Sequence, residues 1–193
     1  MIYGPEGLID PDFNIKTNLD IDNLDIDNLE WQEAYLLAAN KTGILFDYKG
    51  SNENIKQEQL YISKGMNAES SRHYAVFNVS LDLNKFFPNH YYYVSYLKLP
   101  AGYNLWWHRD FYYSFLNKYN IKNRNKNSIS RTIINLNDWS PGQLFQVEDA
   151  IAVKWKIGDC YTFKENIWHG VGNFSLEDYV IMQITWIDKN DIL

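Results

Sequence analysis

The second half of the chain is a series of short β-type runs, and this pattern limits the fold more than any other feature of the sequence. Runs of β-branched and aromatic residues alternate with turn signals at PAG, SPG, ED and IGD. The runs are YYYVSYLKL, YNLWWHRDF, RTIINLNDW, QLFQVED, AIAVKWK, DCYTF, IWHGVGNF and YVIMQITWI. Eight strands at such spacing predict a barrel or a two-sheet jelly roll.

The 193 residues are expected to form one domain with three parts. Residues 1–28 are polar and acidic and predict a solvated arm, residues 29–90 predict a helical support region outside one sheet, and residues 91–187 form the β core. The clearest helical pattern runs from Asp27 to Gly43, because it starts on N-cap candidates and ends on glycine. The predicted fold class is therefore mainly β with N-terminal helices.

Charge and cysteine content exclude several function classes. A net charge of -6, from 24 acidic and 18 basic residues, is the opposite of what binding to a phosphate backbone needs, so we expect no nucleic-acid partner. The single cysteine, Cys160, excludes an intrachain disulfide framework and a multi-cysteine metal site. No secretory leader and no apolar run of membrane-spanning length is present, which predicts a cytoplasmic protein without membrane contact.

The segment NLWWHRDFYY places a histidine and an aspartate inside the most aromatic window of the chain. On a strand, side chains two residues apart share a face, so Trp106, His108 and Asp110 are expected to point the same way and Arg109 the other way. His108 and Asp110 could then hold one metal ion, with Trp106 as a wall of the pocket. The following segment FYYSF is predicted to form its lip.

A second histidine, His169, lies on a later predicted strand, where alternation puts it on one face with Ile167, Val171 and Asn173. Two histidines and one carboxylate make the facial triad of non-haem Fe(II) oxygenases. A histidine and an aspartate on a half-buried strand are also a common structural pair, and this alternative stays open. His73 and His90 are expected to be structural or solvated.

Four segments in this order resemble the Fe(II)- and 2-oxoglutarate-dependent dioxygenases, whose double-stranded β-helix carries HxD…H ligands. The segments are LPAGYNLWWHRD, RTIINLNDWSPGQLFQVED, VKWKIGDCYTF and IWHGVGNFSLEDYVIMQITW, and the resemblance extends over roughly residues 91–187. The arginine strand between the two ligand segments resembles the branch of aspartyl/asparaginyl β-hydroxylases and free-proline hydroxylases.

This resemblance implies a cupin-like barrel in which His108, Asp110 and His169 bind Fe(II) and take part in catalysis. It implies 2-oxoglutarate as cosubstrate, with release of succinate and CO2, and hydroxylation of an amino-acid or peptide side chain. The substrate would be a small molecule or a peptide. The sequence indicates neither its identity nor the oligomeric state.

One position departs from the family pattern. Most members carry an arginine or lysine about ten residues after the second histidine, where this chain has Tyr179. Arg131, on one face with Asn135, is the replacement that we predict for the cosubstrate carboxylate, because a guanidinium offers a bidentate fork. Tyr96 and Tyr179 are predicted to add hydroxyl donors.

Two other functions are compatible with the sequence. The missing base near Tyr179 favours a cupin-like metalloprotein that does not use 2-oxoglutarate. A non-catalytic β-sandwich binding module, in which His108 and Asp110 form a structural pair, would bind no metal.

Overall fold

The computed structural model describes residues 2–3, 24, 26, 28–35, 72–110 and 112–193. The elements in this part of the chain are β1 (Ile2–Tyr3), β2 (Gln32–Tyr35), β3 (Arg72–Val79), β4 (His90–Leu99), β5 (Asn104–His108), α3 (Tyr113–Lys118), β6 (Ser130–Asn135), β7 (Gln143–Val147), β8 (Ala150–Ala152), β9 (Cys160–Lys164), β10 (His169–Asn173), β11 (Tyr179–Asp188) and the 3-10 turn η3 (Lys189–Asp191). None of the helices described is long and apolar enough to cross a membrane.

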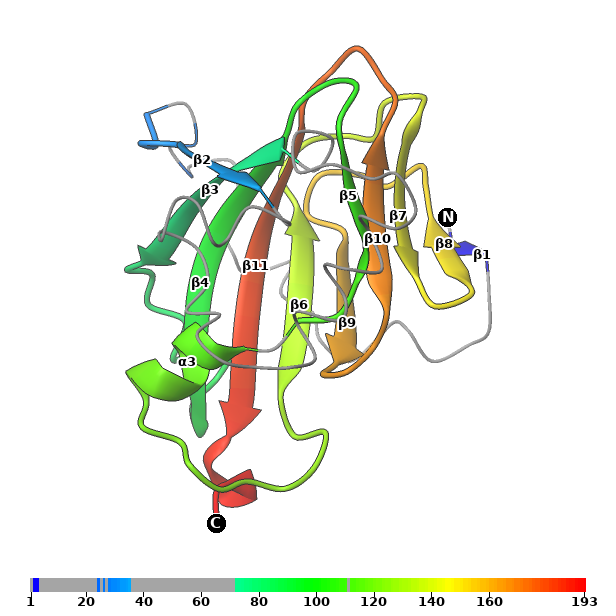
Figure 1. Cartoon of the computed structure of the whole chain (residues 1–193). Helices are drawn as coiled ribbons and strands as arrows, with labels where there is room; N and C mark the ends of the chain where they lie inside the picture. Colours follow the sequence, from blue (N-terminus) through cyan, green and yellow to red (C-terminus); the bar gives the residue numbers. More distant parts are fainter. Residues whose placement is uncertain (1, 4–23, 25, 27, 36–71, 111) are drawn as a thin grey trace.

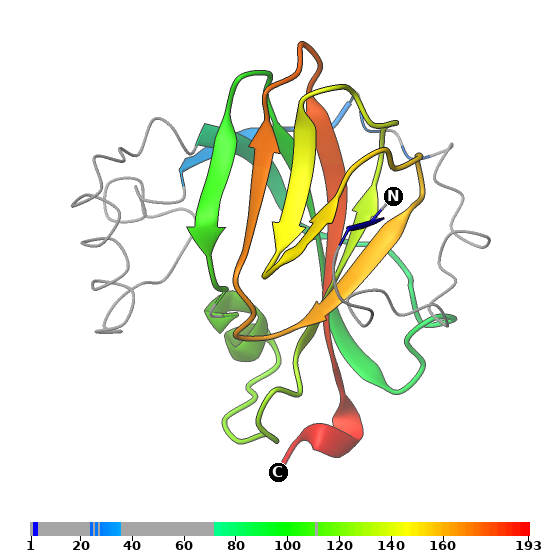
Figure 2. The same cartoon turned by 90° about the vertical axis from the view of Figure 1, so that its right-hand side faces the viewer.

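Two antiparallel sheets pack face to face (Figure 1), and Figure 2 shows the smaller sheet in front of the larger one. The larger sheet has the order β2-β3-β4-β11-β6-β9, and the smaller has the order β1-β8-β7-β10-β5. From β4 to β11 the chain crosses repeatedly between them, which is the strand order of a double-stranded β-helix, or jelly roll. All eight predicted strands are confirmed as β4 to β11.

Alternation along β11 divides its side chains between two apolar clusters. Tyr179 and Ile181 point between the sheets, where they join residues of the smaller sheet such as Val171. Met182 and Ile184 point to the outer face of the larger sheet and pack in a second cluster. Because both faces of this strand are buried, its sequence is almost continuously apolar rather than alternating.

The outer face of the larger sheet is covered by the N-terminal part of the chain and by the turn before β4. Buried Leu83 and Phe87 lie in this outer cluster. Partly buried residues of the N-terminal part also pack there, namely Leu24, Ile26, Leu29 and Trp31. Leu24 and Ile26 therefore pack on the sheet, although they belong to the predicted solvated arm.

The helix predicted from Asp27 to Gly43 is wrong where the structure describes it. Gln32–Tyr35, inside the predicted helix, is strand β2 and pairs with β3, which itself extends the larger sheet beside β4. Helix propensity is a weak local preference, and an open sheet edge that can accept another strand overrides it. Ile2–Tyr3, in the predicted solvated arm, pairs with β8. The rest of the predicted helix, residues 36–43, lies outside the described residues.

Candidate metal centre

The two predicted histidine ligands lie side by side on neighbouring strands of the smaller sheet. His108 is the last residue of β5 and His169 is the first residue of β10, and the antiparallel register pairs them directly. Their ring centroids are 4.3 Å apart, and both residues are buried. Figure 2 shows β5 ending and β10 beginning at the same end of the barrel, next to α3.

Asp110 reaches the same point from just beyond the end of β5. Its Oδ2 lies 3.4 Å from His169 Nε2, and its Oδ1 lies 3.8 Å from His108 Nε2. Ligand atoms of the three residues all lie within 4.8 Å of one another. This group could therefore hold one metal ion, as the spacing of the residues predicts.

A β-bulge in β5 changes the alternation that the sequence predicts. The register moves by three residues on β5, from His108 to Leu105, but by only two on β10, from His169 to Val171. Leu105 and His108 therefore both face the interior. The predicted strict alternation of side chains along this strand is therefore wrong. The side chain of Trp106 lies outside the described part of the structure.

A backbone contact orients His169 toward the ion position. Its Nδ1 lies 3.1 Å from the carbonyl oxygen of Ile167, which is the hydrogen bond that a ring with a proton on Nδ1 donates. This tautomer leaves the lone pair of Nε2 facing Asp110 and available to a metal. The ring of Phe163 packs on the imidazole at 4.8 Å, which further limits its rotation.

Arg131 binds the ligand carboxylate directly. Its Nη1 lies 2.7 Å from Asp110 Oδ2, and the same guanidinium donates to Gln183 Oε1 at 3.2 Å and to Thr185 Oγ1 at 3.1 Å. All three partners of Arg131 lie at the ligand end of the barrel. The sequence predicts Arg131 as the partner of a cosubstrate carboxylate, which stays a prediction, and it did not predict the contact with Asp110.

Tyr112 closes the site under backbone strain. Its φ is 57°, a left-handed conformation that is uncommon for residues other than glycine, and its ring lies 4.9 Å from the Cζ of Arg131. Strained residues of this kind concentrate at functional sites. The ring is buried, which raises the pKa of the Tyr112 hydroxyl far above its ordinary value, so this group is a neutral wall of the site.

The charges around Asp110 keep it ionised. Burial raises the pKa of this carboxyl, but Arg131 and then His169 lower it by more, so the pKa of Asp110 lies well below its ordinary value. Its Oδ2 is buried and accepts no hydrogen bond of good geometry in the described structure, although His169 Nε2 and Arg131 Nη1 both lie near it. An ionised carboxylate with an unsatisfied oxygen between two imidazoles fits a divalent metal ion.

Asp110→Asn should destabilise the metal-free protein by roughly 1–3 kcal/mol at neutral pH, because Arg131 loses its counter-charge. The folded-state pKa of Asp110 is below its unfolded value, so this stabilisation is present above about pH 3.9 and is lost as the pH falls below it. Urea unfolding of both proteins from neutral to acid pH measures the difference. A difference that stays constant through the acid range would contradict the assignment.

The remaining predicted site residues do not gather at the metal ligands. Tyr179 donates a hydrogen bond of 2.7 Å to Asn135 Oδ1, and both are fully buried away from the ligand end of β6 and β11. The prediction of Tyr96 as a donor to the cosubstrate is wrong, because it packs in the cluster on the outer face of the larger sheet. An aromatic residue on a strand buried on both faces carries no local signal of which face it occupies.

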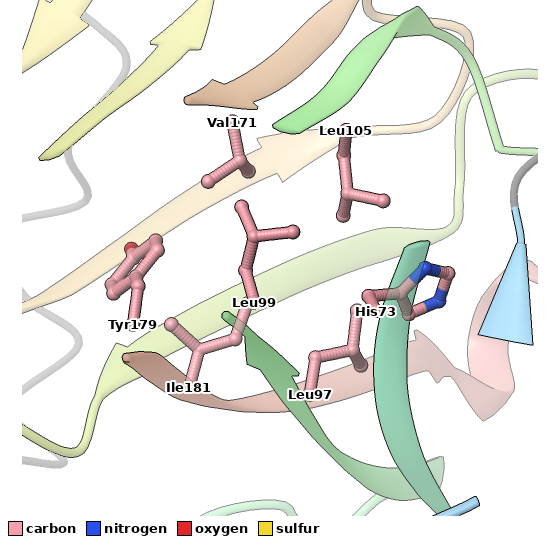
Figure 3. Close-up of a pocket in the computed structure, with 7 residues that line it drawn as sticks. All are labelled: His73, Leu97, Leu99, Leu105, Val171, Tyr179 and Ile181. Atoms are coloured by element: carbon pink, nitrogen blue, oxygen red, sulfur yellow. The ribbon is translucent and has the colours of Figure 1, made fainter. Parts of the chain in front are cut away.

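A small cavity lies in the barrel interior on the side of the ligands toward Tyr179 (Figure 3). Its lining surface is apolar and is formed by His73, Leu97, Leu99, Leu105, Val171, Tyr179 and Ile181. Leu105 and Val171 are the next inward residues after the two histidine ligands. This cavity has room for about one water molecule.

The sequence did not predict the contacts that Tyr112, Gln183 and Thr185 make with Arg131. Tyr112 was predicted only as part of a pocket lip, and Gln183 and Thr185 were not singled out. Polar residues on the inward face of an otherwise apolar strand were the available signal, because a buried polar group needs a partner.

No family model matches the sequence, and no curated protein matches it either. The structure is similar to a cupin domain from Bordetella pertussis Tohama I, at 19% identity over 62% of this chain and 93% of that chain, with a TM-score of 0.36. It is also similar to a predicted oxalate decarboxylase from Thermotoga maritima, at 12% identity over 60% and 81% of the two chains, with a TM-score of 0.40.

A third similar structure is the nickel complex of the non-heme monooxygenase ThoJ. The identity is 16% over 54% of this chain and 47% of that chain, and the TM-score is 0.40. These are likenesses of fold. The fold is a double-stranded β-helix, which the strand order establishes independently.

Proposed function

We propose that this protein is a mononuclear non-haem Fe(II) oxygenase that uses 2-oxoglutarate to hydroxylate an amino-acid or peptide side chain. One observation carries the proposal: two imidazoles and one ionised carboxylate converge at one end of a double-stranded β-helix. When bound by such a set, Fe(II) keeps open positions at which a cosubstrate and O2 can bind. The resemblance of the sequence to the 2-oxoglutarate-dependent dioxygenases supports the choice of cosubstrate.

The residues of the chain have separate tasks in this proposal. His108, Asp110 and His169 would hold the ion, and the Ile167 carbonyl fixes the orientation of the His169 ring. Arg131 supplies a positive charge next to the ligands, where a carboxylate of the cosubstrate needs a partner.

Burial of the site has a chemical consequence. Phe163 packs on His169, and the Tyr112 ring lies against Arg131, so aromatic surface covers the ligands and the guanidinium. Such walls exclude bulk water from the reacting groups.

A second candidate is a cupin-like metalloenzyme that does not use 2-oxoglutarate. One observation favours it. Arg131, the predicted partner of the cosubstrate carboxylate, already contacts Asp110.

Anaerobic titration with Fe(II) and then 2-oxoglutarate tests both candidates. Chelation of Fe(II) by the keto acid gives a weak visible charge-transfer band, which we expect with 2-oxoglutarate and not with succinate. Stoichiometric Fe(II) binding without the band would favour the second candidate. Failure to bind Fe(II) at all would overturn both and leave the non-catalytic β-sandwich module.

A further inference from the structure

We propose that Arg124 is a positioning residue for the metal ligand His169, and that it acts by holding the carboxylate of Glu165 at the start of the segment that carries this histidine. The inference rests on the metal centre of the proposed function. It adds a residue outside the ligand set on which the metal affinity of that centre depends, and it involves neither 2-oxoglutarate nor a substrate.

A short connection delivers His169 to the site. Residues 165–168 join the end of β9 to His169, the first residue of β10. At the far end of this connection, the carbonyl oxygen of Trp168 accepts a hydrogen bond of 2.8 Å from the backbone N–H of Glu148. Within it, the carbonyl oxygen of Ile167 lies 3.1 Å from His169 Nδ1 and orients the imidazole. The orientation of this ligand therefore depends on how the connection is held at both ends.

The ion pair of Glu165 with Arg124 holds the near end. Arg124 Nη1 and Nη2 each lie 2.6 Å from one carboxylate oxygen of Glu165, which is the bidentate geometry of a strong charge-assisted pair. The backbone N–H of Ile129 donates to the same carboxylate at 3.3 Å, and the backbone N–H of Glu165 donates to the Ile129 carbonyl oxygen at 2.9 Å. The Glu165 side chain is only 4% exposed, so little solvent is available to replace Arg124 as its partner.

Arg124 is itself fixed by the segment that follows β11. It forms an isolated β-bridge with Ile192. The next residue, Asn125, donates from its backbone N–H to the Asp191 carbonyl oxygen at 2.9 Å and from Nδ2 to Asp191 Oδ1 at 2.8 Å. Asp191 lies in η3, directly after an interior strand of the larger sheet, and Figure 1 shows the loop between α3 and β6 passing beside this turn. The sheet therefore sets the position from which Arg124 holds Glu165.

Loss of Arg124 alone would leave an uncompensated charge buried on Glu165, which costs far more than loss of the whole pair. Glu165 must then turn toward water. The chain can give way at the adjoining Asn166, because this residue has a left-handed backbone with a φ of 64° and its side-chain hydrogen bond is exposed. The Ile167 carbonyl oxygen would then move away from His169 Nδ1, and the imidazole would lose the contact that directs its Nε2 to the metal.

Two measurements on Arg124→Gln test the inference. Calorimetric titration with Co(II), an air-stable substitute for Fe(II), should show binding about tenfold weaker than in the parent, which is the lower end of the range for loss of a group that supports a metal ligand. NMR of the metal-free protein should show faster solvent exchange of the His169 Nδ1 proton, because its hydrogen bond to Ile167 is weakened. An effect on overall stability alone would leave the Co(II) affinity of the folded variant unchanged.

Glu165→Gln is the second variant, and it applies even if Arg124→Gln does not fold. It breaks the bidentate pair without burying an unpaired charge, because the Arg124 side chain is 23% exposed and can be solvated. We expect weaker Co(II) binding and faster exchange of the Nδ1 proton here too. The two variants change the net charge in opposite directions, so a change of net charge cannot weaken metal binding in both.

Lys156→Gln is the control. It removes a positive charge from the exposed ion pair of Lys156 with Asp138, at 3.1 Å, which lies in a part of the chain that carries no metal ligand. Co(II) affinity and the exchange of the His169 Nδ1 proton should both match the parent. A loss of affinity as large as that in Arg124→Gln would show that the effect is not specific to the contact with Glu165, and would overturn the inference.

Two further outcomes would overturn the inference and leave the metal centre intact. One is Co(II) affinity equal to that of the parent in the folded Arg124 and Glu165 variants, and the other is unchanged exchange of the His169 Nδ1 proton in both. Absence of Co(II) binding in the parent would instead overturn the proposed function. The exchange measurement uses the metal-free protein, so it would still report whether Arg124 holds the His169 ring.

Discussion

Replacing His108 or His169 by alanine is expected to weaken metal binding by more than about 100-fold. Loss of a group that only supports a ligand typically costs 10- to 100-fold in affinity, so loss of a ligand itself should cost more. Each histidine faces Asp110 through Nε2, and alanine leaves no nitrogen in that position. Calorimetric titration of the parent and the two variants with Co(II) measures the effect.

His90→Ala is the matched control for these two variants. His90 contacts Phe87 and Trp186, which pack in the outer cluster of the larger sheet, so its loss should affect packing but not metal affinity. Circular dichroism establishes that each variant is folded. Metal affinity within a few-fold of the parent in both His108→Ala and His169→Ala would remove the basis of the proposed centre.

Gly142→Ala is expected to destabilise the fold by about 3 kcal/mol or more. Gly142 has a φ of 103°, and an added Cβ would lie 2.7 Å from the backbone carbonyl carbon of Phe174 and 2.9 Å from the backbone nitrogen of Ser175. The carbonyl oxygen of Gly142 accepts a hydrogen bond of 3.0 Å from the N–H of Phe174, which joins the two loops. The backbone of Phe174 can therefore give way to the added Cβ only if the two loops separate. The free-energy cost of overpacking and the cost of a left-handed backbone at an alanine add at this position.

Gly102→Ala separates the two contributions. Gly102 also has a positive φ, of 84°, but no atom lies within 4 Å of the added Cβ. This variant should lose only about 1 kcal/mol from backbone strain. Urea unfolding measures both losses, and equal losses would show that the close contact at Phe174 has no energetic effect. Both glycines contact residues at the end of β10 far from His169, so Co(II) affinity should remain unchanged in the folded variants.

The β core was predictable because its signals are local. Each strand from β4 to β11 is a short run of β-branched and aromatic residues between turn residues, and turns such as SPG contain glycine at a positive φ. The N-terminal region was not predictable in this way. Residues 32–35 contain helix-forming Gln, Glu and Ala, and their strand structure depends on the partner β3, which follows them after a long interval in the chain.

The candidate site shows the same division at the level of single residues. His108, Asp110 and His169 could be singled out from residue type and from their order in the chain, and the structure brings the three together. Tyr96 did not, since a strand buried on both faces offers two equally apolar environments, and only the packing of the N-terminal residues selects one of them.

The sequence by itself determined the strand series, the turns between the strands and the identity of three metal-competent side chains, because periodicity and residue type are properties of short segments. Only the tertiary structure decided which end of the barrel holds them, the bulge that points Leu105 and His108 the same way, and the contact of Arg131 with Asp110. These features depend on the register between strands that are distant in the chain. Register is set by the packing of the whole barrel rather than by any one segment.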